Sequence, residues 1–219
     1  MISAYHSTGN IASVHWSLLY HTISTANTII DRLPVSEVSE EQKTIAEAKA
    51  RFFRGFAYRT LTYLYGGVPL LLTEVIEPKF DYVRASKEEV LRQALTDVEF
   101  AAAHLPSLSS VQDGEVSNAA AYHLLSELYL ATAQYQKAVD AATTVIDDPA
   151  TGLMYTRFGS RANELPGDVY WDLFRKNNQN RSSGNTEGIW VIQIETDTPG
   201  GSGSLTAKDQ TYTLERHHA

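Results

Sequence analysis

Residues Ala46 to Pro69 read AEAKARFFRGFAYRTLTYLYGGVP, which is the most informative part of this 219-residue chain. Apolar and aromatic side chains lie on nearly every face of the helix that this stretch predicts, so we expect neighbours to bury it on several sides. We expect the helix to end at Gly66-Gly67, because glycine adopts a left-handed cap easily and Pro69 cannot continue a helix. The large side chains concerned are Phe52, Phe53, Phe56, Tyr58, Leu61, Tyr63, Leu64 and Tyr65.

An earlier helix is predicted from about Ile11 to Leu33, where apolar residues recur at helical spacing, and Pro34 ends it. Ser39 and Gln42 have the spacing of a capping box, in which each residue bonds the backbone of the other. This box predicts the start of the helix that contains the quoted stretch. The spaced residues of the earlier helix are Trp16, Leu19, Tyr20, Ile23, Ala26, Asn27 and Ile30.

Two further features predict the helices that follow. Ser86 and Glu89 form a second capping box, and Pro106 marks the end of the helix that this box opens. Ser117 is a good N-cap for a pair of helices predicted at residues 118–133 and 136–146. The segment from Val68 to Val75 is too short for another long helix, and we expect it to be extended.

The last helix pair carries the signature of a tetratricopeptide repeat. Such a repeat places an aromatic residue, a leucine, a small residue and a tyrosine on its first helix and an alanine on its second. We expect the preceding helices, at about residues 40–65 and 86–104, to stack on this pair as a degenerate second unit. The signature positions here are Tyr122, Leu125, Ser126, Tyr129 and Ala138.

The character of the chain changes after Asp148. Residues 151–185 are rich in loop-forming residues, and residues 187–194 read as a strand. We therefore expect a helical scaffold over residues 1–150 and, over residues 151–219, a loop-rich segment with one strand. The predicted fold class is mostly α, with stacked tetratricopeptide-like helix pairs forming an α-α superhelix and a strand near the C-terminus.

Composition excludes several classes of function. The formal net charge is −8 and no Lys or Arg cluster is present, so nucleic acid is a poor candidate for a partner. The chain has no cysteine, which excludes disulfides, thiolate metal sites and cysteine nucleophiles. No apolar run reaches the length of about 18 residues that a membrane span needs, and residues 1–6 do not read as a signal peptide.

The pattern of residues resembles the SusD/RagB family. The early W-x-x-L-Y-x-x-I-x-x-A-N helix and the E-x-I-W-x-I-Q element at residues 187–193 add to the resemblance, which covers about residues 16–194. Members of that family are about twice as long or more, so the chain looks like their N-terminal and middle portion, with a truncated ligand-binding region at residues 151–219. The residues that carry the resemblance most closely are Glu47-Ala48-Lys49, Arg54, Ala57-Tyr58, Leu64 to Leu70, Asp97 and Leu105-Pro106.

The resemblance implies a function. SusD-like proteins are surface-exposed lipoproteins of the outer membrane that bind a nutrient without catalysis and pass it to a SusC-like TonB-dependent transporter. The nutrient is most often a glycan, but RagB-type relatives serve peptide uptake, so an oligosaccharide and a peptide both stay open. The lipid anchor would need a cysteine, which is absent from this sequence. No cofactor and no metal are expected.

Two other classes of function remain as alternatives. A tetratricopeptide-type scaffold that binds a protein or peptide partner would explain the repeat signature equally well. A glycosidase would need two carboxyl groups held across a substrate. The pairs Glu74/Glu77 and Asp147/Asp148 are expected to be solvated instead, and Gly201-Ser202-Gly203 and His217-His218 read as a loop and a tail. We therefore name no catalytic residue and do not expect an enzyme.

The three tryptophans are the best candidates for ligand contact, because sugars present C–H faces that stack on indole rings. Trp16 and Trp190 are expected to belong to the core. Trp171 lies in the loop-rich segment and is the candidate ligand-binding residue. Its polar neighbours in sequence are Asn177, Asn178, Asn180 and Arg181.

The helix predicted from the quoted stretch also carries four cations. We expect them to extend to solvent or to pair with Glu47 and nearby acids. These cations are Lys49, Arg51, Arg54 and Arg59.

Overall fold

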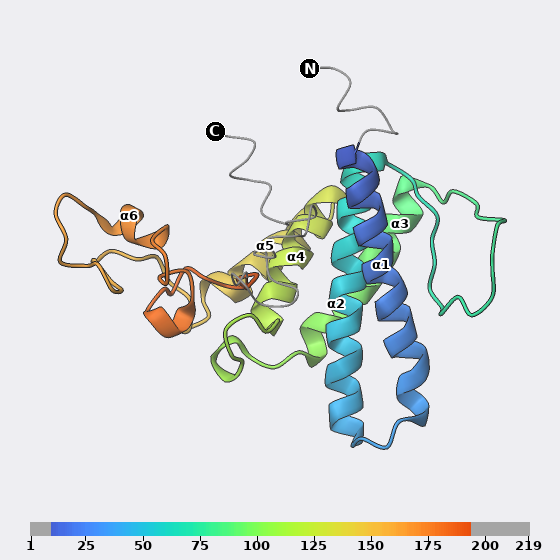
Figure 1. Cartoon of the computed structure of the whole chain (residues 1–219), viewed down its shortest axis with the longest axis horizontal. Coiled ribbons are helices and arrows are strands. Elements are labelled where there is room, and N and C mark those ends of the chain that lie inside the picture. Colours follow the sequence, from blue (N-terminus) through green and yellow to red (C-terminus); the bar gives the residue numbers. More distant parts are fainter. Residues whose placement is uncertain (1–9, 194–219) are drawn as a thin grey trace, which may run out of the picture. The chain divides into compact units, whose positions relative to one another are not determined.

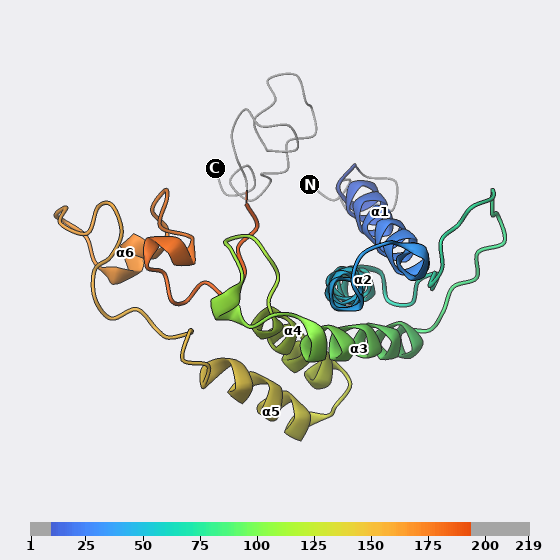
Figure 2. The same cartoon turned by 90° about the horizontal axis from the view of Figure 1, so that it is seen from below.

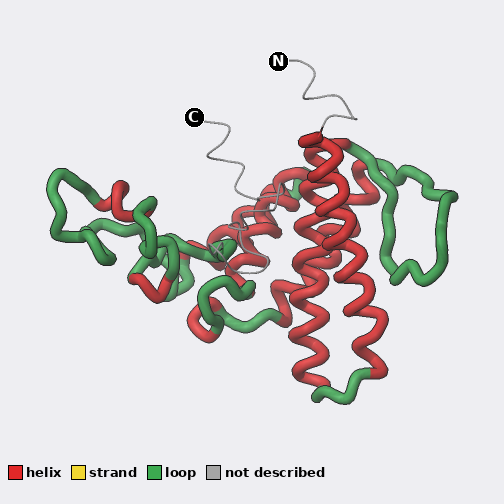
Figure 3. The backbone as a smooth tube through the Cα atoms, in the orientation of Figure 1, coloured by secondary structure: helices red, strands yellow, loops and turns green. Residues whose placement is uncertain are grey.

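The computed structural model describes residues 10–193 and divides the chain into two compact units, each considered by itself. Within the described residues, the helical unit comprises residues 10–111 and 116–152, and the loop unit comprises residues 112–115 and 153–193. Figure 3 shows helices through most of the helical unit and mainly loops in the loop unit. No helix within residues 10–193 combines the length and the apolar character that a membrane span requires.

The helices of the helical unit pack in the order in which they follow along the chain. Helix α1 lies against α2, α2 against α3, α3 against α4, and α4 against α5 (Figures 1 and 2). This sequential stacking confirms the predicted α-helical superhelix. The elements are α1 (Asn10–Arg32), η2 (Leu33–Val35), α2 (Glu40–Tyr65), α3 (Lys87–His104), η3 (Leu108–Ser110), α4 (Asn118–Ala131) and α5 (Tyr135–Ile146).

The predicted caps set the ends of these helices. Ser39 and Gln42 form a complete capping box at the start of α2, and Ser86 and Glu89 form another at the start of α3. The Ser117 hydroxyl accepts a hydrogen bond from the backbone N–H of Ala120 in the first turn of α4. Each box satisfies backbone groups that the first turn of a helix leaves unpaired.

Helix α2 is buried along only part of its surface. Tyr58 and Leu61 are fully buried, but Tyr63 and Leu64 are 50% and 55% exposed. The expected burial on several sides is therefore found against α1 and α3, but it does not reach the large side chains of the last turns. The reason is that α2 packs mainly on two helices, α1 and α3, which cover only part of its circumference.

A buried polar network joins the first three helices. The Arg54 guanidinium on α2 donates to both carboxylate oxygens of Asp97 on α3, with N–O distances of 2.8 and 2.7 Å. A third N–H of Arg54 donates to the side-chain oxygen of Asn27 on α1, at 2.7 Å. All three residues are at most 4% exposed, so each needs the others to satisfy its polar atoms.

The segment between α2 and α3 leaves the helical layer as a long loop whose two ends are joined. Gly66 has a φ of +74°, which ends α2 and which side chains rarely permit. The backbone N–H of Ala85 donates to the Val68 carbonyl, and Pro69 and Arg84 form an isolated antiparallel bridge. We call residues 70–83 the α2–α3 loop.

The loop unit contains short helices only within its described part, namely α6 (Val169–Leu173) and η4 (Arg181–Ser183). The predicted strand is wrong for residues 187–193, which form no ladder with another described segment; Ile194 lies outside the described residues. Side chains hold this segment instead: the Trp190 indole N–H donates to the Gly114 carbonyl, and the Gln193 amide bonds the Asn180 amide. A strand needs a paired neighbour, and no described segment supplies one.

Candidate ligand-binding site

An exposed aromatic pair lies at α6 in the described part of the loop unit, with Tyr170 on the helix and Phe174 at its C-cap. Tyr170 and Phe174 are four residues apart, so they project from the same side of the helix. Their rings lie 5.0 Å apart between centroids in an edge-to-face arrangement, and the two residues are 71% and 72% exposed. Large aromatic side chains exposed together at one place are typical of interaction sites.

Trp171, the residue predicted from the sequence, lies beside this pair and is half-buried. The guanidinium carbon of Arg175 lies 3.2 Å from the centroid of its ring, so a cation already covers one face. The ring also packs against the backbone of Gly167, where a Cβ atom would come within 2.1 Å of the indole. Trp171 therefore remains a candidate whose ring is already partly occupied by protein contacts.

Arg157 holds the loop that carries α6. Its guanidinium pairs with the Asp172 carboxylate and also donates to the carbonyls of Gly167 (2.7 Å), Arg161 (2.9 Å) and Glu164 (3.1 Å). One side chain thus binds backbone oxygens from three places along residues 161–167. This arrangement fixes the path of the chain into α6.

Asp172 is the buried acceptor at the centre of this arrangement and is 0% exposed. Hydrogen bonding from Arg157 lowers the pKa of its carboxyl group below the ordinary value, and the backbone N–H of Phe158 contributes. The Asn178 amide, also fully buried, donates to the carbonyls of Asp172 and Phe158. A carboxylate that accepts several such bonds favours its charged form.

The arrangement on α6 can present an apolar, planar surface with polar groups beside it. Aromatic rings combine a large apolar area with few rotatable bonds, so they bind a ligand at low entropic cost. A sugar ring presents one face of C–H groups and an edge of hydroxyls, which matches this combination. Because the two exposed rings lie at an angle, one ring can stack on the face of a sugar unit while the other contacts the edge of the next sugar unit.

The other two tryptophans are half-buried. Trp16 on α1 packs on Tyr20 and Tyr65, with ring centroids 4.8 and 5.1 Å away. Trp190 is held by the Gly114 carbonyl, as described above. Neither residue offers a fully exposed face, so neither is the first candidate for ligand contact.

One carboxylate of each pair has a structural partner. Glu74 forms an ion pair with Arg32, whose hydrogen bond lowers the pKa of the Glu74 carboxyl group. Asp147 is the C-cap residue of α5, and Asp148 accepts a bond from the N–H of Ala150 in the turn that follows. Gly201-Ser202-Gly203 and His217-His218 lie outside the described residues.

The cations of α2 divide into two kinds. Arg51 pairs with Glu47 one turn away, as expected, and Arg59 pairs with Glu127 on α4. Arg54 does not extend to solvent, because it is buried against Asp97. These cations therefore stabilise the helical layer, and they offer no anion-binding cluster.

Sequence reasoning located the aromatic segment at residues 170–174 but selected only its tryptophan. Tyr170 and Phe174 were missed as candidates, although their spacing of four residues places them on one side of any helix there. Asp168 provides a second signal, because its carboxylate accepts from the N–H of Trp171 as an N-cap. The coverage of Trp171 by Arg175 follows only from the three-dimensional structure.

Comparison with known proteins identifies the relatives of this chain. The SusD-like family described as starch-binding and associating with the outer membrane matches residues 3–130. SusD-like protein P25 of Formosa agariphila is 23% identical over 163 residues, which cover 72% of this chain and 31% of that protein.

Two solved structures share the fold. A SusD-like protein from Bacteroides fragilis superposes with a TM-score of 0.69 at 23% sequence identity. The matched region covers 84% of this chain and 34% of the Bacteroides fragilis protein. A laminarin-binding SusD-like protein superposes with a TM-score of 0.60 at 28% sequence identity. Here the matched region covers 65% of this chain and 33% of the laminarin-binding protein. The chain thus spans about a third of the length of these relatives. Since the family match covers more than half of this sequence, the chain belongs to the SusD-like family.

Proposed function

We propose that this chain takes part in capturing a glycan at the surface of the outer membrane, without catalysis. The observation that carries the proposal is the family match over residues 3–130, since the family is described as starch-binding and outer-membrane-associated. A relative of the same fold at 28% identity binds laminarin, a neutral glucan. A peptide nutrient is the alternative outcome of the tests below.

Tyr170 and Phe174 are the proposed contact residues, with Trp171 beside them. Support comes from their exposure, their shared face on α6, and the Arg157 and Asp172 contacts that hold this helix in place. A preorganised aromatic surface loses little entropy on binding. The exposed rings are uncharged and apolar, which suits the C–H face of a sugar ring.

Delivery to a SusC-like TonB-dependent transporter is the second part of the proposal. Its support is the family resemblance, in which the helical repeats form much of the surface that faces the transporter. A test is co-purification of the chain with the TonB-dependent receptor encoded next to its gene. Capture of the receptor supports delivery, and its absence from a complex with an otherwise glycan-binding protein would overturn this part alone.

The contact residues are tested with affinity electrophoresis in gels that contain laminarin or xyloglucan. We expect the wild-type chain to be retarded and Tyr170→Ala/Phe174→Ala to lose about tenfold in affinity, which corresponds to about 1.4 kcal/mol. The matched control is Tyr135→Ala, because Tyr135 is 65% exposed but lies on α5 in the helical unit. Equal retardation of all three proteins would remove α6 from the proposal.

The non-catalytic part has its own measurement. Prolonged incubation with either polysaccharide should release no new reducing ends. Release of oligosaccharides by the wild-type chain, abolished by substitution of a carboxylate, would replace a binding function by a hydrolytic one.

A further inference from the structure

A groove runs between α1 and the α2–α3 loop in the helical unit. Its volume is about 450 Å³, within the range of about 300–1,000 Å³ that small-ligand sites occupy. No Asp, Glu, Lys, Arg or His is among the residues that line it. These residues are Trp16, Tyr20, Ile23, Ser24, Asn27, Pro69, Leu71, Thr73, Val75 and Tyr82.

Aromatic side chains line the groove from both elements. Trp16 and Tyr20 come from α1, with ring centroids 4.8 Å apart, and Tyr82 comes from the α2–α3 loop and is 46% exposed. The fully buried Ile23 adds an apolar surface. The groove thus offers ring faces to a flat apolar surface of a ligand.

The deeper polar groups of the groove already have partners. The Asn27 amide donates to the carbonyls of Leu71 and Thr73, at 3.0 and 3.1 Å, and the Tyr20 hydroxyl donates to the Pro69 carbonyl at 2.7 Å. These bonds also hold the first residues of the α2–α3 loop against α1. The side of the groove formed by residues 69–73 is therefore held in place by the protein itself.

Three hydroxyl groups at the groove are available for hydrogen bonding to a ligand. The side chains of Ser24, Thr73 and Tyr82 make no hydrogen bond within residues 10–193, and all three residues are exposed. Each hydroxyl can both donate and accept. Apolar rings combined with a few free hydroxyls and no charge are the complement of a sugar ring, which has C–H faces and hydroxyl edges.

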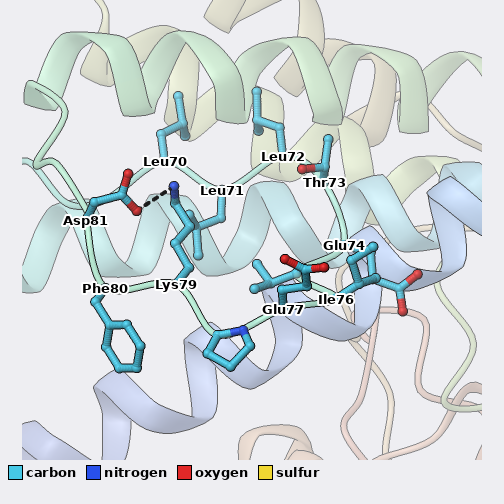
Figure 4. A pocket seen from close by; sticks show the side chains of 12 residues that line it. Leu70, Leu71, Leu72, Thr73, Glu74, Ile76, Glu77, Lys79, Phe80 and Asp81 are labelled. Atoms are coloured by element: carbon cyan, nitrogen blue, oxygen red, sulfur yellow. Dashed lines mark ion pairs between the residues drawn. The ribbon is translucent and has the colours of Figure 1, made fainter.

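Charged groups near the groove neutralise one another. Lys79 and Asp81, two residues apart within the α2–α3 loop, form an ion pair at 2.8 Å (Figure 4), and Glu74 pairs with Arg32. The same loop encloses an open hollow of about 770 Å³ lined by residues 70–81. Paired charges leave little net field to attract an ionic ligand into the groove.

We propose that this groove is a second glycan subsite, which holds one neutral sugar ring between Tyr82 and the Trp16–Tyr20 pair. It rests on the proposed function, because it assigns the same class of ligand to a place in the helical unit. Ser24, Thr73 and Tyr82 exchange hydrogen bonds with the sugar hydroxyls. Charged sugars are disfavoured, because no lining residue is charged and the nearby Lys79 ammonium, 5.9 Å from the centroid of the Tyr82 ring, is already paired with Asp81.

Isothermal titration with laminaritriose, a neutral glucan oligosaccharide, tests the subsite. We expect the α6 variant Tyr170→Ala/Phe174→Ala to retain a binding event that is weakened at least tenfold when Tyr82→Ala is added. Tyr82 is half-exposed on a loop, so its removal leaves the helical layer folded, which circular dichroism verifies. Ser24→Phe, which fills the groove from an exposed position on α1, should abolish the same event, and Tyr135→Ala should leave it unchanged.

The outcomes separate this inference from the proposed function. Residual binding that survives both Tyr82→Ala and Ser24→Phe would overturn the groove and leave glycan capture intact. Binding that is lost in Tyr82→Ala but unaffected by the α6 substitutions supports the groove as a glycan subsite and contradicts the assignment of Tyr170 and Phe174 as contact residues. No binding of any neutral oligosaccharide by the wild-type chain overturns both proposals. Equal affinity for trigalacturonate would overturn the selectivity for neutral sugars.

Discussion

Both units hold an arginine–aspartate pair whose carboxylate is fully buried, but the surroundings of the two pairs differ. Arg54 and Asp97 lie among three packed helices whose apolar side chains, such as Tyr58 and Val98, are fully buried. Around Arg157 and Asp172, Phe158 is the only large apolar side chain that is buried within the described part of the loop unit. There, backbone carbonyls and amides provide most of the contacts.

This difference separates two ways of holding a loop. In the helical unit, apolar burial supplies most of the stability, and the polar network specifies where residues 71–73 attach. In the loop unit, hydrogen bonds from a few side chains replace the missing core. Substitutions should therefore act on global unfolding in the first unit and on local opening in the second.

The largest effect is expected for Asp97→Ala. The substitution leaves the buried guanidinium of Arg54 without its carboxylate partner, which costs about 3–5 kcal/mol for a buried pair. Urea unfolding followed by circular dichroism measures the loss. Arg32→Gln, which removes an ion pair whose arginine is largely exposed, is the matched control and should leave the midpoint unchanged. Equal midpoints for both variants would contradict a special role for the buried network.

A smaller effect is expected for Tyr58→Phe. Burial raises the pKa of the Tyr58 hydroxyl to about 12, so it stays protonated at neutral pH and donates to the Leu71 carbonyl. It also accepts from the N–H of Leu71, at 2.6 Å. Removing it leaves the N–H of Leu71 unpaired, at about 1–3 kcal/mol, whereas the Leu71 carbonyl keeps its bond from the Asn27 amide. Faster amide exchange at Leu71 with unchanged exchange in α5 would confirm the assignment, and uniform exchange changes would contradict it.

The smallest effect on global stability is expected for Asp172→Asn, which sharpens the comparison by acting on the loop unit alone. Because the folded pKa of Asp172 lies below the unfolded value of about 4, the Arg157 contact stabilises the loop above that pH. The contribution is lost as the pH falls through the lowered folded value.

The measurement for Asp172 is amide exchange at Phe158, whose N–H donates to this carboxylate. The wild-type chain should lose protection only in acid, whereas Asp172→Asn should lack protection at neutral pH and keep the unfolding midpoint of the helical unit. Asp140→Asn, an exposed substitution on α5, serves as the control. A lowered midpoint for the helical unit would show that the two units do not respond separately.

Local patterns in the sequence predicted the fold well, because caps and helical periods depend on residues a few positions apart. The boxes at Ser39 and Ser86 and the pair Arg51–Glu47 are of this kind. The partner of Arg54 is 43 residues away in sequence, so no local rule could have selected Asp97. The strand prediction failed for a related reason, since strand formation depends on a distant partner segment.

The candidate sites likewise combine features that depend on nearby residues with features that depend on residues far apart in the sequence. The segment 170–174 could be recognised because three aromatic residues lie within five positions. The choice among them required the position of Arg175, which covers Trp171. The groove joins Trp16 and Tyr82, which only the packing of α1 against the α2–α3 loop brings together.

The joined ends of the α2–α3 loop have a consequence for the evolution of binding. The Val68–Ala85 hydrogen bond and the Pro69–Arg84 bridge close the loop at its base, so the helices below do not depend on its length. Doubling the length of a flexible loop costs only about 0.6 kcal/mol. Residues 71–74 are held by bonds from α1 and α2, so residues 75–83 are the part that can be exchanged, lengthened or shortened without a change in the helical layer.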